Sequence, residues 1–192
     1  MAKRESTFGN MVIVLFLVTF IASATLGGIY ELTKGPIELA KQAKKESSIK
    51  QVLPEFDKLK SYKIKPEDGT DSLEFNDAYL NNELIGTAIE TYTDKGFSGR
   101  VKIMVGLLPD GSIYNTAVVE HKETPGLGDK MDASKSDFSE QFKGKMPTKE
   151  NLTVKKDGGN VDAITAATIS SRAFCDAVER ASKAYTTKGG NQ

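Results

Sequence analysis

Residues 6–30 carry no charged side chain, and within them runs an almost wholly apolar core from Met11 to Ile21. As an α-helix this segment would span ~37 Å at ~1.5 Å per residue, which exceeds the ~30 Å hydrocarbon layer of a bilayer. Each Leu, Ile, Val and Phe in it favours membrane insertion by about 0.3–0.6 kcal/mol. An uncharged stretch of this length is too long for the buried helix of a soluble protein, so it predicts a transmembrane helix.

The flanks of this segment allow a second interpretation. Lys3 and Arg4 ahead of it, and the small residues Ala22-Ser23-Ala24 near its end, are also typical of a cleavable secretory signal. We expect a retained anchor, with residues 1–33 as tail and membrane helix. Both flanks are mildly basic, so the positive-inside rule does not set the orientation. A short tail left inside and a long exported domain is the usual outcome for a signal-like start, and we expect the bulk of the chain to be extracytoplasmic.

Composition narrows the possible chemistry. The chain has 26 basic and 26 acidic residues, so it lacks the basic excess of a protein that neutralises nucleic-acid phosphates, and no nucleic-acid partner is expected. The single cysteine, Cys175, cannot form an internal disulfide, and it excludes Cys-rich zinc and iron–sulfur sites. With His121 as the single histidine, multi-histidine metal sites are excluded too, and no metal is expected.

Beyond the anchor we expect two parts. Residues 34–60 are predicted to form an amphipathic stalk helix and linker, because apolar residues recur between Lys and Glu from Pro36 to about Leu53 and Pro54 then stops the helix. Residues 61–192 are predicted to be one compact extracytoplasmic domain. Within that domain residues 62–82 are polar and carry no decisive pattern.

The rest of the domain alternates in a way typical of an α+β fold. Three segments rich in β-branched residues predict strands, and Pro109-Asp110-Gly111 between the last two suits a hairpin turn; the segments are 84–92, 101–108 and 112–119. A short helix over 132–142, edge strands at 151–155 and around Val161, and a closing helix over 170–185 complete the prediction. The fold class is therefore α+β, with an N-terminal transmembrane helix and helices packed on an antiparallel sheet.

Two short segments stand out as candidate sites. The first, residues 121–130, places Gly126 and Gly128 around one leucine directly after a strand, so its backbone can approach a flat ligand closely. The same glycines would also serve a plain strand-to-helix connection. The second, residues 162–171, brings several hydroxyls to the start of the last helix, where Ser170 or Ser171 is a plausible N-cap and free N–H groups favour an anion. Simple capping of an Ala-rich helix explains this pattern equally well.

Taken together, Glu123-Thr-Pro-Gly-Leu-Gly128 and Asp162-Ala-Ile-Thr-Ala-Ala-Thr168 resemble the covalent-FMN-binding domain family. That family includes the G subunit of the Rnf ion-translocating ferredoxin:NAD⁺ oxidoreductase and the C subunit of the Na⁺-translocating NADH:quinone reductase. Its attachment pattern is Asp, two variable residues, Ser or Thr, Gly, Ala and the modified Thr. The resemblance extends over nearly the whole chain, and the short chain and the segment that begins at His121 fit the Rnf member better.

The resemblance implies a residue for each part of the site. It assigns the FMN phosphodiester to the Thr168 hydroxyl and gives cofactor-binding roles to eight further residues: Asp162, Thr165, Ala167, Glu123, Thr124, Leu127, Gly128 and Lys130. One position departs from the pattern, since the usual glycine is Ala166 here. If that position requires a positive φ, alanine costs about 1 kcal/mol there.

The resemblance also implies a function. The chain would be an electron-carrying subunit of a membrane oxidoreductase that relays electrons from ferredoxin toward NAD⁺ through its flavin, with no catalytic residue of its own. Its partners would be the membrane, iron–sulfur and flavin subunits of the Rnf complex and, for maturation, a flavin transferase. It would sit in the inner (cytoplasmic) membrane with its bulk on the periplasmic side. The alternatives are the equivalent quinone-reductase member, a flavin-free, membrane-anchored sensor or adhesion domain, and a flavin reductase on the membrane face that acts on a soluble substrate.

Overall fold

The computed structural model describes residues 7–66 and 71–189. The chain divides into two compact units, Met1–Ala43 and Lys44–Gln192. The first unit consists of most of helix α1, and the second holds the end of that helix together with a sheet and a second long helix. The predicted division at residues 33 and 60 stays a prediction.

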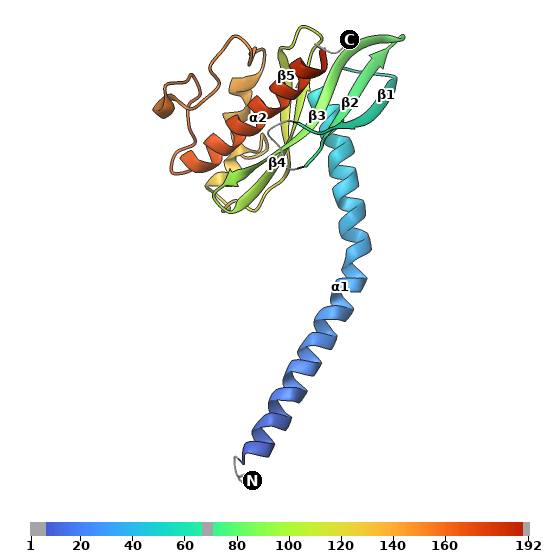
Figure 1. Ribbon diagram of the computed structural model, residues 1–192, viewed down its shortest axis with the longest axis vertical. Helices are drawn as coiled ribbons and strands as arrows, with labels where there is room; N and C mark the ends of the chain where they lie inside the picture. The colour runs from blue at the N-terminus through green and yellow to red at the C-terminus, as the bar shows by residue number, and fades with distance from the viewer. Residues whose placement is uncertain (1–6, 67–70, 190–192) are drawn as a thin grey trace. The chain divides into compact units, whose positions relative to one another are not determined.

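Helix α1 (Phe8–Val52) is one unbroken helix (Figure 1). It is long and apolar enough to cross a membrane, and none of its most apolar stretch is buried within the protein. We expected a second helix to begin at Pro36, but the structure differs: α1 continues through Pro36 without a break. Proline removes one backbone donor and disturbs one turn, but the long helical runs on both sides carry the helix past it. As expected, the helix ends just before Pro54.

Among the described residues, five strands form one antiparallel sheet in sequence order (Figure 1). The strands are β1 (Lys58–Ile64), β2 (Leu73–Leu80), β3 (Glu83–Gly96), β4 (Gly99–Leu107) and β5 (Ile113–Glu120). Each pairs with the next along the chain, so the sheet is a simple meander. The α+β class and the antiparallel sheet predicted from the sequence are confirmed, as are the strands β3, β4 and β5.

Strand β2 lies in the polar segment 62–82, whose sequence carries no decisive pattern, and β1 runs into that segment from the predicted linker. Asn76 and Asp77 of β2 are buried polar residues, and both are hydrogen-bonded across strands: Asn76 accepts from the Ser61 hydroxyl at 2.7 Å, and Asp77 accepts from the Thr87 hydroxyl at 2.7 Å and from Tyr62 at 3.0 Å. A buried polar group costs little when it is hydrogen-bonded in this way.

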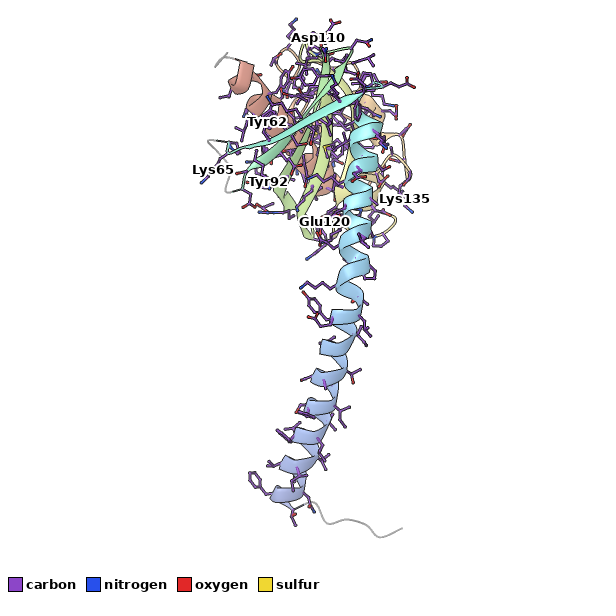
Figure 2. The ribbon with its side chains drawn as sticks, turned by 90° about the vertical axis from the view of Figure 1, so that its right-hand side faces the viewer. Tyr62, Lys65, Tyr92, Asp110, Glu120 and Lys135 are labelled. Atoms are coloured by element: carbon purple, nitrogen blue, oxygen red, sulfur yellow. The ribbon has the colours of Figure 1, made fainter. Side chains whose placement is uncertain are left out.

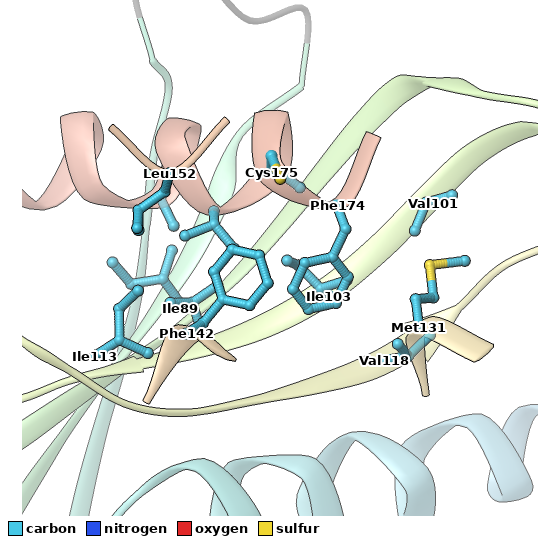
Figure 3. Close-up of a cluster of buried hydrophobic side chains, with 14 of the residues drawn as sticks. Ile89, Val101, Ile103, Ile113, Val118, Met131, Phe142, Leu152, Phe174 and Cys175 are labelled. Carbon is cyan, nitrogen blue, oxygen red and sulfur yellow. The ribbon is translucent and has the colours of Figure 1, made fainter. Parts of the chain in front are cut away.

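Helix α2 (Thr168–Gly189) covers one face of the sheet and encloses the main core. Figure 3 shows Phe174 reaching from α2 toward Ile103 on the sheet, with Phe142 beside it. The Phe142 and Phe174 ring centroids are 5.0 Å apart, and Phe138 lies edge-on to Phe174 at 5.4 Å. Cys175 is buried in this core as a small packing residue, and desolvation raises the pKa of its thiol to about 12.

The opposite face of the sheet receives the last turns of α1. Ile49, Val52 and Leu53 pack there on a surface of small side chains that includes Ala78, Ala88 and Ala117. Gly106 is required at this contact, because a Cβ there would overlap the Val52 carbonyl oxygen. The end of the helix therefore lies directly against the backbone of β4.

An ion pair reinforces this contact. Glu74 on β2 and Glu90 on β3 are direct partners in the sheet register, an arrangement in which like charges repel. The Lys45 ammonium lies between them, 2.8 Å from Glu74 and 2.9 Å from Glu90. One lysine from α1 thus offsets part of the repulsion between two opposed carboxylates on the sheet.

Two local predictions were wrong. Instead of a helix over 132–142 there are turns and bends over 132–137 and one short 3₁₀ turn, η2 (Phe138–Phe142); another 3₁₀ turn, η1 (Gly128–Met131), lies just before this range. Asp132 ends η1 by accepting the backbone N–H and hydroxyl of Ser134, a local bond that competes with helix. The predicted edge strands at 151–155 and around Val161 amount to one isolated bridge between Val154 and Val161, because the chain folds back through η3 (Lys155–Asp157).

Candidate functional site

Three segments far apart in the sequence meet around a cavity of about 310 Å³. They are the tip of the β3–β4 hairpin, the loop that follows β5, and the turn that leads into α2. The residues that line the cavity are Phe97, Glu123, Thr124, Leu127, Gly128, Ala166, Ala167, Thr168, Ile169 and Ser170. Figure 2 shows Asp110, in the turn between β4 and β5, at one end of the sheet and Glu120, at the end of β5, at the other. The loop that follows β5 therefore starts at the end of the sheet away from the β4–β5 turn. The two segments singled out in the sequence therefore do come together.

The loop after β5 lies tightly against the start of α2. Its backbone is held by the Thr124 carbonyl, which accepts the Leu127 N–H at 3.2 Å. Gly128 is buried, and a Cβ at this position would lie 2.5 Å from the Ser170 Oγ and 2.8 Å from the Glu123 Oε2. The sequence led us to expect that the loop glycines allow close approach to a ligand. At Gly128 the close neighbours are two side chains of the protein itself.

Glu123 connects all three segments. Its side chain is buried, and its Oε1 accepts the Ser98 N–H at 2.8 Å while its Oε2 accepts the Ser170 hydroxyl. Its own N–H donates to the His121 Nδ1 at 3.1 Å, so the histidine satisfies a loop hydrogen bond. Glu123 therefore faces the cavity as part of its frame.

The turn before α2 has an unusual backbone. Ala166 has a φ of 61°, in the left-handed region that glycine adopts readily and alanine does not. The Ala167 N–H bonds to the Ile164 carbonyl at 3.0 Å and closes this turn. The position where the resemblance led us to expect glycine is thus one at which the backbone favours glycine.

Helix α2 begins at Thr168, two residues earlier than predicted, and neither serine is its N-cap. Ser170 donates to Glu123, while the Ser171 hydroxyl accepts the Ile164 N–H at 2.9 Å and donates to the Ala167 carbonyl at 3.0 Å. Both serines lie inside the first turn and tie it to its surroundings. The Ser171 N–H donates to the Ala167 carbonyl at 3.0 Å, whereas the N–H groups of residues 168–170 have no acceptor within the helix, so partial positive charge gathers at Thr168.

Thr168 is half-buried in the cavity wall, next to the exposed apolar side chains of three segments. Phe97 is 69% exposed, Ile169 46% and Leu127 41%, and all three line the same cavity, so their exposed apolar surface is gathered in one place. The cavity therefore combines an apolar rim with hydroxyls and helix N–H groups. This combination suits a flat ring system that carries an anionic group.

Three predicted residues do not line the cavity. Asp162 is exposed and pairs with Lys155 at 2.7 Å, and its backbone N–H donates to the Gln141 Oε1 at 2.8 Å. Thr165 is exposed in the turn before Ala166, and Lys130 lies in η1 with its carbonyl accepting the Ser136 hydroxyl. Their roles stay predictions.

The sequence reasoning missed Phe97 and Ile169. Phe97 stands at a hairpin tip close to Gly96 and Gly99, and an aromatic residue between turn glycines is the signal that could have drawn attention to it. Ile169 has the pattern of an ordinary apolar helix residue in the sequence. Across residues 7–66 and 71–189, no cluster of His, Cys, Asp and Glu is arranged to hold a metal ion.

Comparison with known proteins fits this geometry. The FMN-binding domain family matches residues 96–183, a range that contains every residue lining the cavity. FMN is a flat ring system with a phosphate, which is the kind of ligand the cavity suits.

Several curated relatives are similar to this chain over most of its length. The G subunit of the ion-translocating oxidoreductase complex of Pasteurella multocida is 35% identical over 88% of this chain and 88% of its own length. The proteins of the same name from Aliivibrio fischeri and Vibrio atlanticus are each 36% identical. The alignment covers 93% of this chain and 89% of the relative in the first case, and 87% and 86% in the second.

Proposed function

Because the chain belongs to the family of the G subunit of the Rnf-type ion-translocating oxidoreductase complex, we propose that it carries electrons within such a complex through an FMN bound at Thr168. The observation that carries the proposal is the meeting of the 123–128 loop and the Thr168 helix start around one cavity. FMN, when bound, would supply the electron transfer. The role of the chain is to attach it, orient it and shield it.

Each part of FMN has a counterpart among the described residues. The Thr168 hydroxyl would form the phosphodiester, and the N–H groups of the first turn of α2 would stabilise its negative charge by up to about 1 kcal/mol. Phe97, Leu127 and Ile169 offer apolar surface to a ring system at the cavity mouth.

The wider assignment rests on the relatives and on helix α1. We assign the direction from ferredoxin to NAD⁺, with the iron–sulfur, flavin and membrane subunits of the complex as electron partners and neighbours. The chain would be anchored by the apolar part of α1 in the inner membrane, with residues 44–192 on the periplasmic side. A covalent bond suits this location, since lost FMN would not be replaced there. The equivalent quinone-reductase role is less favoured, because the relatives from all three organisms are named as the G subunit of an ion-translocating complex.

The attachment is tested with a matched pair of threonines. The full chain is produced together with a flavin transferase, and we expect a fluorescent band on a denaturing gel and a mass gain equal to FMN less one water. Thr168→Val should abolish both signals. Thr165→Val should keep both, because Thr165 is exposed and lies outside the cavity.

Two outcomes would contradict the proposal. Fluorescence retained in Thr168→Val would move the attachment to another residue. A wild-type chain with the mass of the bare polypeptide would favour the flavin-free sensor or adhesion domain.

A further inference from the structure

Glu123 differs in charge from everything else around the cavity. It is 4% exposed, and it is the single ionisable residue among the described residues that line the cavity. A carboxylate removed from water needs hydrogen-bond donors to remain charged. Glu123 has two of them, the Ser98 N–H at 2.8 Å and the Ser170 hydroxyl.

These donors fix the carboxylate in one place. Ser98 belongs to the β3–β4 hairpin tip and Ser170 to α2, so each oxygen is held by a different segment of the frame. Two glycines make room for it: a Cβ on Gly96 would lie 2.9 Å from Oε1, and a Cβ on Gly128 would lie 2.8 Å from Oε2. The three segments around the cavity therefore hold the Glu123 carboxylate in a fixed position.

We propose that Glu123 is a positioning residue of the FMN site whose fixed negative charge lowers the reduction potential of the bound flavin. The proposal rests on the proposed function, since it requires FMN in this cavity. An electron that arrives without a proton adds one negative charge to the cavity, and a buried carboxylate in the wall opposes that charge more strongly than one in water would. The helix N–H groups at Thr168 act in the opposite sense.

Glutamine at this position separates the charge from the hydrogen bonds. In Glu123→Gln the amide oxygen can still accept the Ser98 N–H, and the amide NH₂ can donate to the Ser170 oxygen, so the frame keeps both links. Glu123→Ala removes the links and the charge together. Glu179→Gln is the control, because it removes the same charge from an exposed position on α2.

The experiment is a redox titration of the flavin-loaded full chain in detergent. We expect Glu123→Gln to load flavin and to favour the reduced form about tenfold more at a given ambient potential, which is about 59 mV for a one-electron couple. Glu179→Gln should leave the potential unchanged. Ser170→Ala removes a hydrogen-bond donor from the Glu123 carboxylate, so less of its negative charge is offset and the reduction potential of the flavin should become more negative. This variant tests the effect of the charge even if Glu123→Gln fails to fold.

The positioning role has a readout that needs no flavin. In urea unfolding of the flavin-free chain, Glu123→Ala should be clearly less stable than Glu123→Gln, and a wild-type midpoint for Glu123→Ala would overturn that role. A potential in Glu123→Gln and Ser170→Ala equal to that of the wild type would overturn the electrostatic role alone. A wild-type chain that carries no FMN by mass would instead overturn the proposed function, and this inference with it.

Discussion

Replacing Ala166 with glycine measures the strain in the turn that leads into α2. At a φ of 61° the alanine Cβ crowds the following carbonyl, which costs about 1–2 kcal/mol. Glycine removes that strain but also gives the unfolded chain more freedom, a loss of about 0.4–1 kcal/mol. Because Ala166 is exposed, no packing is lost. The centres of these two ranges differ by about 0.8 kcal/mol, which is the net stabilisation we expect.

Urea unfolding of the full chain in detergent, followed by tyrosine fluorescence, can detect this change. Five of the six tyrosines lie in residues 44–192, so the signal reports on that unit. With a urea dependence of about 2 kcal/mol per M, the midpoint should rise by about 0.3–0.5 M.

The matched control is Ala133→Gly. Ala133 is also an exposed turn alanine, but it is outside the set of positive-φ residues, so glycine there should lower stability by about 0.4–1 kcal/mol. Opposite signs for the two variants are the expected result. A loss of stability at Ala166 equal to that at Ala133 would refute the argument from backbone strain.

Three further changes test other parts of the structure. Gly128→Ala should destabilise the chain by about 1–3 kcal/mol, since the new Cβ would lie 2.5 Å from the Ser170 Oγ; a midpoint like that of the wild type would contradict the close approach. Lys45→Met should cost about 1–3 kcal/mol by leaving two opposed carboxylates unneutralised, whereas the exposed neighbour Lys44→Met should cost less than about 0.5 kcal/mol. Burial raises the pKa of Cys175 above its unfolded value of 9.0 to about 12, so stability should fall as pH rises from 9 toward 12, and Cys175→Ala, titrated in parallel, should fall less.

The sheet was predictable where its strands follow the general rules. β3, β4 and β5 alternate and are rich in β-branched residues, and Gly111 between the last two has a φ of 83°, as a tight turn requires. β1 and β2 were not predictable in the same way, since Asn76 and Asp77 are typical of loops. Their partners Ser61 and Thr87 are 15 and 10 residues away, and only the folded register shows that the polar atoms are satisfied.

The site was predictable in part, and mainly through the resemblance. Spacing alone left the 121–130 loop and the start of the last helix with ordinary structural explanations, and nothing local showed that they would meet. The role of Ser170 was unpredictable for the same reason, because its partner Glu123 is 47 residues away. The helix boundary was missed because Thr168 is a weak helix former whose position is fixed by the turn at Ala166.

The order of the elements along the chain has a consequence for biogenesis. Each strand of the meander pairs with the strand made just before it, so the sheet can form before the later segments of the chain are in place. The cavity cannot, because one of its three sides is the beginning of α2, which follows all five described strands in the chain. A chain cut short before residue 166 would keep all five described strands but lack Thr168, so under the proposed attachment FMN could be joined only after the start of α2 has been made.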